Sequence, residues 1–415
     1  MKINMVENKK NKIKKSLKKE KKIKSKISKK VSVKKVGARK ISQKPVKKST
    51  KKVLRQKKHT LTKKEEGLRL RRYYSNPILG PNTNSWESMA VFNPGVVMSN
   101  GRVHLFYRAL GPDGLSRIGY ASSKDGINFD ERLPYPVYLV KEDFPVHENN
   151  TSYLPPEYNT SLYSSGGGWG GCEDPRTVKI EDRIYMTFNI FKSWNDIRVG
   201  VTSISEKDLN EKRWTWDSLS YLSHPGDRQK NWVIFPEKFN GKFAVFHNLD
   251  KGDSNRVHIA FVNKLHYSET PKGIDAPDPQ QIPDHKVSWH IRTRSASAPP
   301  LKTKDGWLLL YHAMEKNDFG KYKLGALLLD LNDPEKVLYR SKEPILEAKE
   351  WYENDWKPGI VYASGAVIKD HRLFVYYGGG DKHIGVASIL LDELLESMKK
   401  DKSIKLKKEN MISLN

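Results

Sequence analysis

Strand-length apolar segments alternate with polar turns along the chain from about residue 68 to residue 390. Val, Ile, Tyr, Phe and Trp dominate these segments, and Gly, Asn, Asp and Pro cluster between them, which is typical of β-strands joined by turns. An amphipathic helical pattern is visible only in DELLESMKK, residues 392–400. The pattern therefore predicts an all-β protein with one short helix that packs outside the last strands.

Five segments of this region share one frame: a small or polar residue beside Pro or Gly, an apolar strand, a polar turn, and a second strand rich in aromatic residues. They read FNPGVVMSNGRVHLFYRA, EDPRTVKIEDRIYMTFNI, FPEKFNGKFAVFHNL, SAPPLKTKDGWLLLYHAM and SGAVIKDHRLFVYYGGG. Aligned on their turns, they are anchored at Gly101, Asp182, Gly241, Gly306 and His371, with spacings of 81, 59, 65 and 65 residues. These segments are therefore internal repeats.

A third strand follows the repeats, as in SRIGYASS, IRVGVTSI, NRVHIAFV, YKLGALLL and HIGVASIL. Three or four strands recurring at this interval are typical of propeller blades, which pack on one another around an axis. The sequence therefore predicts a five-bladed β-propeller. The long first spacing contains a Pro-, Asn- and Gly-rich insertion, residues 141–168, which we expect over one mouth of the central funnel.

Polar residues stand at matching places in the repeats, where core packing would favour Val or Ala. The first strand of each blade lines the central channel, so residues that begin these strands converge in space. The aligned positions are Asn93, Asp174, Glu237, Pro299 and Gly365, and the partner strands end in Arg108, Asn189, Asn248, His312 and Tyr377. Polar groups that orient hydroxyls, beside aromatic faces that stack on pyranose rings, favour a sugar-binding funnel. The alternative is a solvated channel whose side chains satisfy one another, at a cost for any left unpaired.

The segment GCEDPR, residues 171–176, follows a run of glycines and begins one of these strands. A carboxylate placed where a loop enters a rigid strand is typical of catalytic sites, although Asp174 before Pro175 can also simply shape a turn. The neighbouring Cys172 has no activating His nearby, so we expect a small buried residue. A single Cys excludes an intrachain disulfide and fits a reducing cytoplasm.

The charge is concentrated at the N-terminus. Residues 1–64 hold 28 Lys and Arg against Glu7 and Glu20, a net charge of +26, whereas residues 65–415 carry 47 − 46 = +1. Without aromatic residues this Lys-rich tail cannot form a core, and we predict a disordered segment, 1–64, before a propeller domain, 65–415. Such lysines attract nucleic acid or anionic surfaces without sequence preference. The alternatives are an unconstrained solvated extension or a start codon assigned too early.

Neither a signal peptide nor a run of 18 apolar residues is visible, which favours a cytoplasmic protein without a transmembrane segment. The His residues are scattered and paired Cys residues are lacking, so the sequence predicts no metal site. No Gly-rich phosphate loop precedes a helix, so we expect no nucleotide cofactor.

The motifs FNPGVV, HLFYRA, IGYASSKDGINF, GCEDPR, NWVIFPEKFNGKFAVFH, GWLLLYHAM, LLDLNDPEKVLYRSKEPIL and VYYGGGDKHIGVA span nearly all of residues 73–396. Together they resemble glycoside hydrolase family 130, the five-bladed β-mannoside phosphorylases and β-mannosidases. The resemblance implies that Asp174 is the general acid and that Asn93, Arg108 and Asp381 hold the mannosyl unit. We expect Glu173 and His312 as further substrate contacts. The resemblance also implies inversion of configuration, with the proton relayed through the mannose 3-hydroxyl.

Phosphorolysis and hydrolysis make different demands on such a site. Phosphate arrives as an anion and needs a cationic cradle, whereas inverting hydrolysis needs a second carboxylate to deprotonate water. The resemblance places Lys230, Asn248 and Arg294 where the family's phosphorylases carry two Arg and one Lys, so Asn248 departs from the pattern. His383, and further His312 and Lys238, could add positive charge or donors. The candidate bases for hydrolysis are Glu237, Glu353 and Asp355.

We favour phosphorolysis, because Lys230 and Arg294 would otherwise hold unneutralised charge in the funnel. The expected reaction transfers a mannosyl unit from a β-mannoside oligosaccharide to inorganic phosphate and releases α-mannose 1-phosphate, with no cofactor. The alternatives are an inverting β-mannosidase and a non-catalytic glycan-binding propeller tethered by its tail. A five-bladed furanosidase would need three carboxylates on different blades and fits FNPG and EDPR poorly. The β-1,2 or β-1,4 linkage, the acceptor sugar and assembly into a homo-oligomer stay open.

Overall fold

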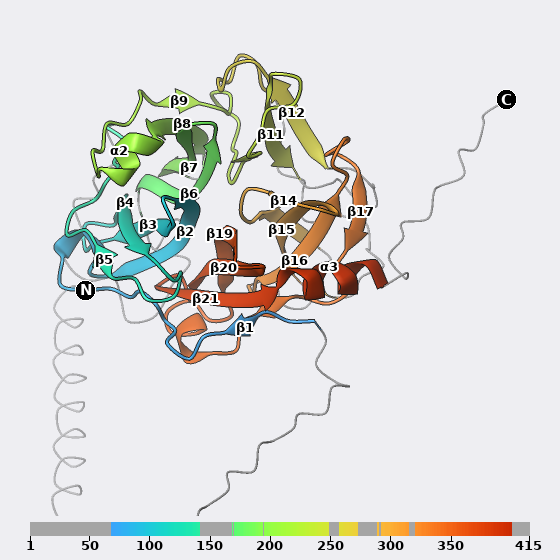
Figure 1. Cartoon of the computed structure of the whole chain (residues 1–415). Helices are drawn as coiled ribbons and strands as arrows, with labels where there is room; N and C mark the ends of the chain where they lie inside the picture. The colour runs from blue at the N-terminus through green and yellow to red at the C-terminus, as the bar shows by residue number, and fades with distance from the viewer. Residues whose placement is uncertain are drawn as a thin grey trace, which may run out of the picture. The chain divides into compact units, whose positions relative to one another are not determined.

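The computed structural model describes residues 68–141, 168, 170–193, 195–248, 257–272, 289, 292–314 and 320–400. All of them belong to one compact unit, Lys63–Asn415. The predicted disordered tail, residues 1–64, lies outside the described residues. So do residues 142–167 of the insertion that we expected over the funnel. Four sheets and only short helices make up the described part, which confirms the all-β class (Figure 1).

The largest sheet has eight strands and contains the first two repeats. Its order is β2-β3-β4-β6-β7-β8-β9, with β5 beside β4. The bounds are β2 (Ala90–Ser99), β3 (Arg102–Leu110), β4 (Leu115–Ser123), β5 (Glu131–Arg132), β6 (Gly170–Ile180), β7 (Arg183–Ser193), β8 (Asp196–Ser205) and β9 (Ser220–Tyr221).

A short parallel pairing joins the two repeats in this sheet, although the sequence predicted two separate blades. Residues Leu115 and Ser116 of β4 pair with Gly170 and Gly171 of β6. Gly171 has φ +98°, and a Cβ there would lie 2.2 Å from the carbonyl oxygen of Ser116. Glycine therefore allows the two backbones to approach closely enough to pair.

The other three sheets hold one repeat each. The three-stranded sheet runs β10 (Val233–Ile234), β11 (Phe243–Asn248) and β12 (His258–Val262). The six-stranded sheet comprises β13 (Arg292–Ala296), β14 (Leu301–Thr303), β15 (Gly306–Met314), β16 (Lys323–Leu329), β17 (Val337–Arg340) and β18 (Leu346–Glu347). The four-stranded sheet has the order β1 (Arg71–Arg72), β21 (His383–Leu390), β20 (Arg372–Gly379) and β19 (Val361–Lys369). A strand from the beginning of the described chain thus completes the last sheet.

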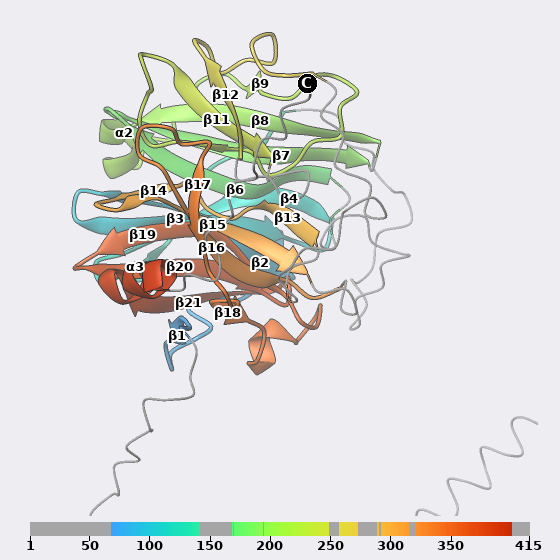
Figure 2. The same cartoon turned by 90° about the vertical axis from the view of Figure 1, so that its right-hand side faces the viewer.

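The strands fall into five groups by repeat: group 1 (β2–β5), group 2 (β6–β9), group 3 (β10–β12), group 4 (β13–β18) and group 5 (β19–β21 with β1). Apolar cores lie between neighbouring groups. One core joins groups 1 and 2, and others join groups 2 and 3, 3 and 4, and 4 and 5. A further core joins group 5 back to group 1 through Tyr376, Val386, Leu105 and Tyr107. Each group therefore packs on two others, as the views in Figures 1 and 2 also indicate.

The predicted helix is confirmed as α3 (Leu391–Lys400), and its Leu394, Leu395 and Met398 pack into the core between groups 4 and 5. The sequence did not predict α2 (Glu206–Asn210), η1 (Ser85–Glu87) or η2 (Trp351–Glu353). Elements of three to five residues are too short to show a helical period. No helix of the described part is long and apolar enough to cross a membrane.

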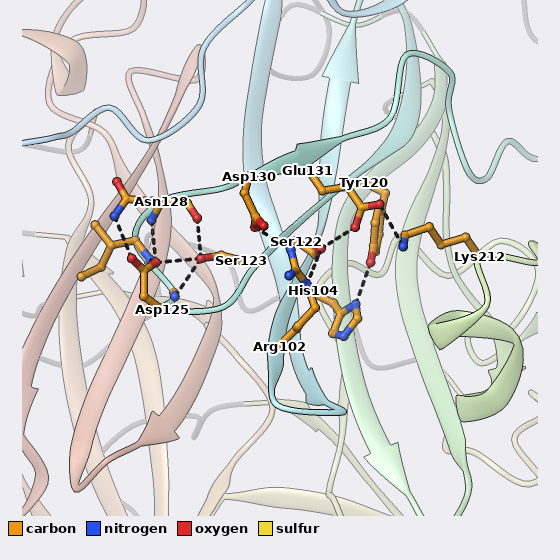
Figure 3. A network of polar contacts seen from close by, with 12 residues as sticks. Arg102, His104, Tyr120, Ser122, Ser123, Asp125, Asn128, Asp130, Glu131 and Lys212 are labelled. Carbon is orange, nitrogen blue, oxygen red and sulfur yellow. Dashed lines mark hydrogen bonds and ion pairs between the residues drawn. The ribbon is translucent and has the colours of Figure 1, made fainter.

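The motif IGYASSKDGINF folds into β4 and a tight turn that leads to β5 (Figure 3). The carboxylate of Asp125 accepts hydrogen bonds from the backbone N–H groups of Ile127 and Asn128, at 2.8 and 2.7 Å, and from the Ser123 hydroxyl at 2.8 Å. Burial would raise the pKa of Asp125, but these hydrogen bonds lower it. The contacts give this motif a structural role in the turn.

An aromatic ring lies over a glycine in four of the five groups. The cross-strand pairs are Tyr107–Gly119, Phe188–Gly200, Tyr311–Gly325 and Tyr377–Gly385. A Cβ built on these glycines would lie 2.3 to 3.0 Å from atoms of the paired ring. In these four repeats the glycine in the third strand therefore makes room for the aromatic residue of the second strand, an arrangement that protects the glycine backbone.

We expect Gly325→Val to lower the free energy of unfolding by about 1–3 kcal/mol, the usual cost of overpacking a core. The added side chain would start 2.5 Å from the Tyr311 ring and 2.6 Å from Trp289, and both rings are buried. Gly320→Val is the matched control, because a Cβ at Gly320 meets no atom within 4 Å. Thermal melting of both variants tests this, and equal melting temperatures would contradict it.

Candidate active site

Asn93 and Asp174 occupy the same unusual backbone conformation in groups 1 and 2. Their φ angles are 48° and 51°, a left-handed region that Asn and Asp tolerate better than other side chains do. Each lies at a β-bulge, where the register shifts between Phe92 and Gly95 and between Glu173 and Arg176. Because a bulge leaves one residue outside the ladder, it redirects that side chain.

The bulges correct the predicted equivalence of strand beginnings. In groups 4 and 5 the register shifts at Arg294 and Ser364, whereas the sequence alignment placed Pro299 and Gly365 there. In group 3, Asn231 has φ 67° before β10, while the proposed equivalent Glu237 lies beyond that strand and pairs with Lys302 at the surface. The alignment counted back from the turns, and the strands between turn and bulge differ in length.

Four of the predicted site residues contact one another in a buried cluster. The Asn93 amide donates a hydrogen bond of 2.7 Å to Oδ1 of Asp174. The Arg108 guanidinium lies between two carboxylates, with Nη2 3.0 Å from Oε1 of Glu173 and Nη1 3.6 Å from Oδ1 of Asp174. These contacts bring the FNPG, FYRA and EDPR motifs together.

Lys230 joins this cluster from the loop before β10. Its Nζ lies 2.9 Å from Oε2 of Glu173 and 5.0 Å from the centre of the Phe191 ring. Asn189 fixes the next residue, since its Oδ1 accepts the Asn231 backbone N–H at 2.8 Å and its amide donates to Oδ1 of Asn231 at 3.0 Å. The pair of asparagines therefore positions Lys230 beside Glu173.

Arg176 is a member of the cluster that the sequence analysis did not single out. Its side chain is 1% exposed and donates to the carbonyl oxygens of Asp174 and Ser297, at 2.8 and 2.9 Å. It also donates to the Tyr362 hydroxyl at 3.1 Å. A signal was available, because Arg176 follows directly in the EDPR motif.

His312 is connected to Arg176 through Tyr362. The rings of His312 and Tyr362 stack with their centres 4.1 Å apart and their planes at 10°. The Ser295 hydroxyl lies 3.3 Å from the Tyr362 hydroxyl. Burial raises the pKa of Tyr362 to about 12, so its hydroxyl stays neutral.

Asp381 lies in the turn between β20 and β21, with φ 54° and an ion pair of 3.2 Å to Lys357. The backbone N–H of Val91 donates to the carbonyl oxygen of Lys382 at 3.1 Å, which ties this turn to β2. A Cβ at Gly378 would lie 2.1 Å from Oδ1 of Asn93. Asp381 and Asn93 are therefore held on adjoining backbone.

The charges around Asp174 decide its protonation. Burial alone would raise the pKa of Asp174, but Arg108, Arg176 and Lys230, with the Asn93 hydrogen bond, hold it below its ordinary value. Three cations, Arg108, Arg176 and Lys230, thus lie around the carboxylates of Glu173 and Asp174. The cluster is therefore suited to attract an anion.

The described contacts of His383 are made with residues other than those of this cluster. Its Nε2 contacts Oδ2 of Asp355 at 2.8 Å, and its ring meets the edge of Trp351. Burial lowers the pKa of His383 in spite of Asp355, so the imidazole is neutral at pH 7. We therefore leave His383 out of the proposed phosphate site.

The candidate bases make other contacts. The carboxylate of Glu353 binds Arg72 and Tyr377, that of Asp355 binds Lys382 and His383, and that of Glu237 binds Lys302. The side chains of Asn248 and Arg294 lie outside the described part of the chain. Cys172 is buried, as predicted.

Among the residues that the structure describes, no three His, Cys, Asp or Glu side chains are grouped so that they could hold a metal ion.

Comparison with known proteins gives consistent matches. The model of glycoside hydrolase family 130, described as beta-1,4-mannooligosaccharide phosphorylase, matches residues 56–400. A 1,2-beta-oligomannan phosphorylase from Thermoanaerobacter sp. is 36% identical over 339 residues, which cover 79% of this chain and 99% of that protein. A beta-1,2-mannobiose phosphorylase from Listeria innocua is 27% identical over 373 residues, covering 79% and 98%.

Two solved structures share the fold. A glycosyl hydrolase from Bacteroides ovatus has a TM-score of 0.58 at 22% identity, covering 77% of this chain and 92% of its own. The beta-1,2-mannobiose phosphorylase from Listeria innocua, in complex with beta-1,2-mannobiose, has a TM-score of 0.56 at 23% identity, covering 80% and 99%. With a family match over most of its length, the chain belongs to glycoside hydrolase family 130.

Proposed function

We propose that the five strand groups are the blades of a five-bladed β-propeller. The support is the cyclic packing, in which each group shares one apolar core with the group before it and another with the group after it. Such stacking around an axis is the packing that propellers use to protect their sheet edges. The bulged residues Asn93 and Asp174 then come from neighbouring blades.

We propose that the protein is an inverting β-mannoside phosphorylase that releases α-mannose 1-phosphate. The observation that carries this proposal is the buried carboxylate of Asp174 among the cations Arg108, Arg176 and Lys230. A cationic cradle suits phosphate, and guanidinium and ammonium groups are its usual ligands. The relatives named above are phosphorylases of β-mannosides, which supports the same class of reaction here.

In this proposal Asp174 is the general acid, and Asn93, Arg108 and Asp381 hold the mannosyl unit. Glu173 positions two of the cations, since Arg108 and Lys230 bind its two oxygens. The Ser364 hydroxyl, at the bulge of group 5, is buried without a hydrogen-bond partner in the described part of the chain.

Phosphate would also prepare the acid for its task. Before phosphate binds, the cations keep Asp174 ionised, which is the wrong form for donating a proton. An anion bound to Lys230 would weaken the attraction of this cation for the Asp174 carboxylate and raise the pKa of Asp174. The nucleophile would therefore promote protonation of the residue that must protonate the leaving group.

Hydrolysis is the second candidate, because Asn248 stands where the family's phosphorylases carry a cation. An inverting hydrolase needs a base about 6.5–9.5 Å from the acid, with room for a water molecule. All three candidate bases form ion pairs with other residues: Glu237 with Lys302, Glu353 with Arg72 and Asp355 with Lys382. We therefore favour phosphate as the nucleophile.

We expect Lys230→Met to raise KM for phosphate by about 10- to 100-fold, since a hydrogen bond to a charged group contributes about 1.5–3 kcal/mol. KM for the mannoside should change far less. Lys238→Met is the matched control, because Lys238 pairs with the exposed Glu181. Steady-state kinetics with each substrate varied in turn distinguishes the two effects. An unaltered KM for phosphate would remove Lys230 from the proposed phosphate site.

A further inference from the structure

Trp351 is a large aromatic residue at the surface of the protein. Its side chain lies on η2 and the residue is 62% exposed. Glu350 and Glu353 form a capping box that fixes this helical turn. The indole ring meets the ring of Tyr352 at 5.8 Å and 89°, and that of His383 at 5.3 Å and 70°. These contacts restrict the indole, so a ligand that stacks on it costs little side-chain conformational entropy.

His383, which contacts the indole, connects it to further polar groups. The Asp355 carboxylate contacts Nε2 of His383 at 2.8 Å and Nζ of Lys382 at 2.9 Å. The side chains of Asp355 and Lys382 are each 33% exposed, so both can still bind a ligand. A flat apolar face with hydrogen-bonding groups at its edge is suited to a pyranose ring, which has apolar C–H faces and equatorial hydroxyls.

This surface is continuous with the proposed active site. The segment after η2 packs on the turn that carries Asp381, since the backbone N–H of Lys357 donates to the carbonyl oxygen of Gly380 at 2.9 Å. A Cβ at Gly379 would lie 2.9 Å from the carbonyl oxygen of Tyr352. Asp381 lies in the turn two residues before His383, the first residue of β21. The indole and the predicted mannose-binding carboxylate therefore belong to one packed unit.

We propose that Trp351, Asp355 and Lys382 form an outer subsite that binds a mannosyl residue remote from the cleaved bond. This inference rests on the proposed function and extends it: the preferred substrates are β-mannan oligosaccharides, whose leaving group is long enough to reach the indole. A single aromatic ring is too small to anchor a protein partner, which needs a contact of about 800 Å² on each side. The balanced charges of Lys382 and Asp355 do not favour a nucleic acid.

The test compares phosphorolysis of β-mannobiose and β-mannotetraose, in both the β-1,2- and the β-1,4-linked series, by the full chain and its variants. For Trp351→Ala we expect the ratio of kcat/KM, tetrasaccharide over disaccharide, to fall about tenfold, mainly through KM. Trp351→Phe should restore most of this ratio, because it keeps an aromatic face. Tyr74→Ala is the control, since Tyr74 is fully exposed and should leave the ratio unaltered. A ratio that does not respond to Trp351→Ala would overturn the outer subsite.

A second experiment distinguishes the absence of phosphorylase activity from the absence of the outer subsite. If the unsubstituted protein phosphorolyses neither substrate, calorimetric titration of mannotetraose into the protein and into Trp351→Ala still tests the subsite. A tenfold weaker affinity in the variant would support it. Equal affinities, or no binding to the unsubstituted protein, would overturn it.

Discussion

Replacing Asp174 by Asn is expected to lower kcat for mannoside phosphorolysis by about 100- to 10,000-fold, the range that general acid–base catalysis contributes. Asn has nearly the same shape as Asp but has no acidic proton to donate. The Asn93 amide can still donate its hydrogen bond to an Oδ1 atom at residue 174, where it now bonds at 2.7 Å. The geometry of the cluster should therefore survive while the chemistry is lost.

The charge balance makes this variant more informative. Neutralising residue 174 removes one negative charge from beside Arg108, Arg176 and Lys230. The affinity for phosphate should therefore stay the same or rise, so the loss should be confined to kcat. A variant that failed mainly through KM for phosphate would indicate that Asp174 binds rather than catalyses.

Steady-state rates and a thermal melt of the same preparation test this prediction. Asp130→Asn is a suitable control, because the Asp130 carboxylate is half exposed and pairs with Arg102 beside the turn shown in Figure 3. The control should keep full activity. Retention of more than about a tenth of the activity by Asp174→Asn, well outside the range above, would exclude Asp174 as the acid.

Replacing Glu353 by Ala should have the largest effect on stability. Its carboxylate is fully buried and accepts hydrogen bonds from Arg72 at 2.6 and 2.9 Å and from the Tyr377 hydroxyl at 2.8 Å. The backbone N–H groups of Lys349 and Glu350 also donate to it, at 2.6 and 2.9 Å. Removing one partner of a buried ion pair leaves the other charge uncompensated, which costs about 3–5 kcal/mol.

The same arrangement recurs in group 1, which indicates a structural role. Glu87 ends η1 as Glu353 ends η2, and it binds Arg132 of β5 and the hydroxyl of Tyr107. In each group the Tyr ring lies over a glycine, and the Arg comes from an outer strand. The network of Glu353 thus anchors β1 on the last sheet.

We expect Glu353→Ala to melt about 4–7 °C below the unsubstituted protein, because an unfolding entropy of about 2.1 cal/mol/K per residue over roughly 330 residues gives about 1.4 °C for each kcal/mol. Glu237→Ala is the matched control, because the exposed pair of Glu237 with Lys302 should contribute less than about 1 kcal/mol. Melting of both variants by calorimetry decides the point. Similar melting temperatures for the two variants would show that the Glu353 network is not a main anchor.

The repeat pattern and motifs predicted the strand groups and the helix α3, and they named several residues that meet in the cluster. The exact equivalence of strand beginnings could not be predicted, because bulges add one residue to a strand without a sequence signal of their own. The partners of Glu353, Arg72 and Tyr377, come from other segments of the chain. The sequence alone could not show these contacts, so Glu353 was a candidate base. Arg176 was overlooked because a charged residue within a strand pattern suggests an exposed position, and only the packing buries it.

The central claim is that phosphate, and not water, is the nucleophile, and one incubation tests it directly. The full chain is supplied with β-1,2- and β-1,4-mannobiose, with and without inorganic phosphate, and free mannose and mannose 1-phosphate are quantified. We predict that mannose 1-phosphate forms only when phosphate is present. Without phosphate, hydrolysis of mannobiose to two molecules of mannose should be negligible. Release of mannose at the same rate without phosphate would contradict the account and identify the protein as a hydrolase.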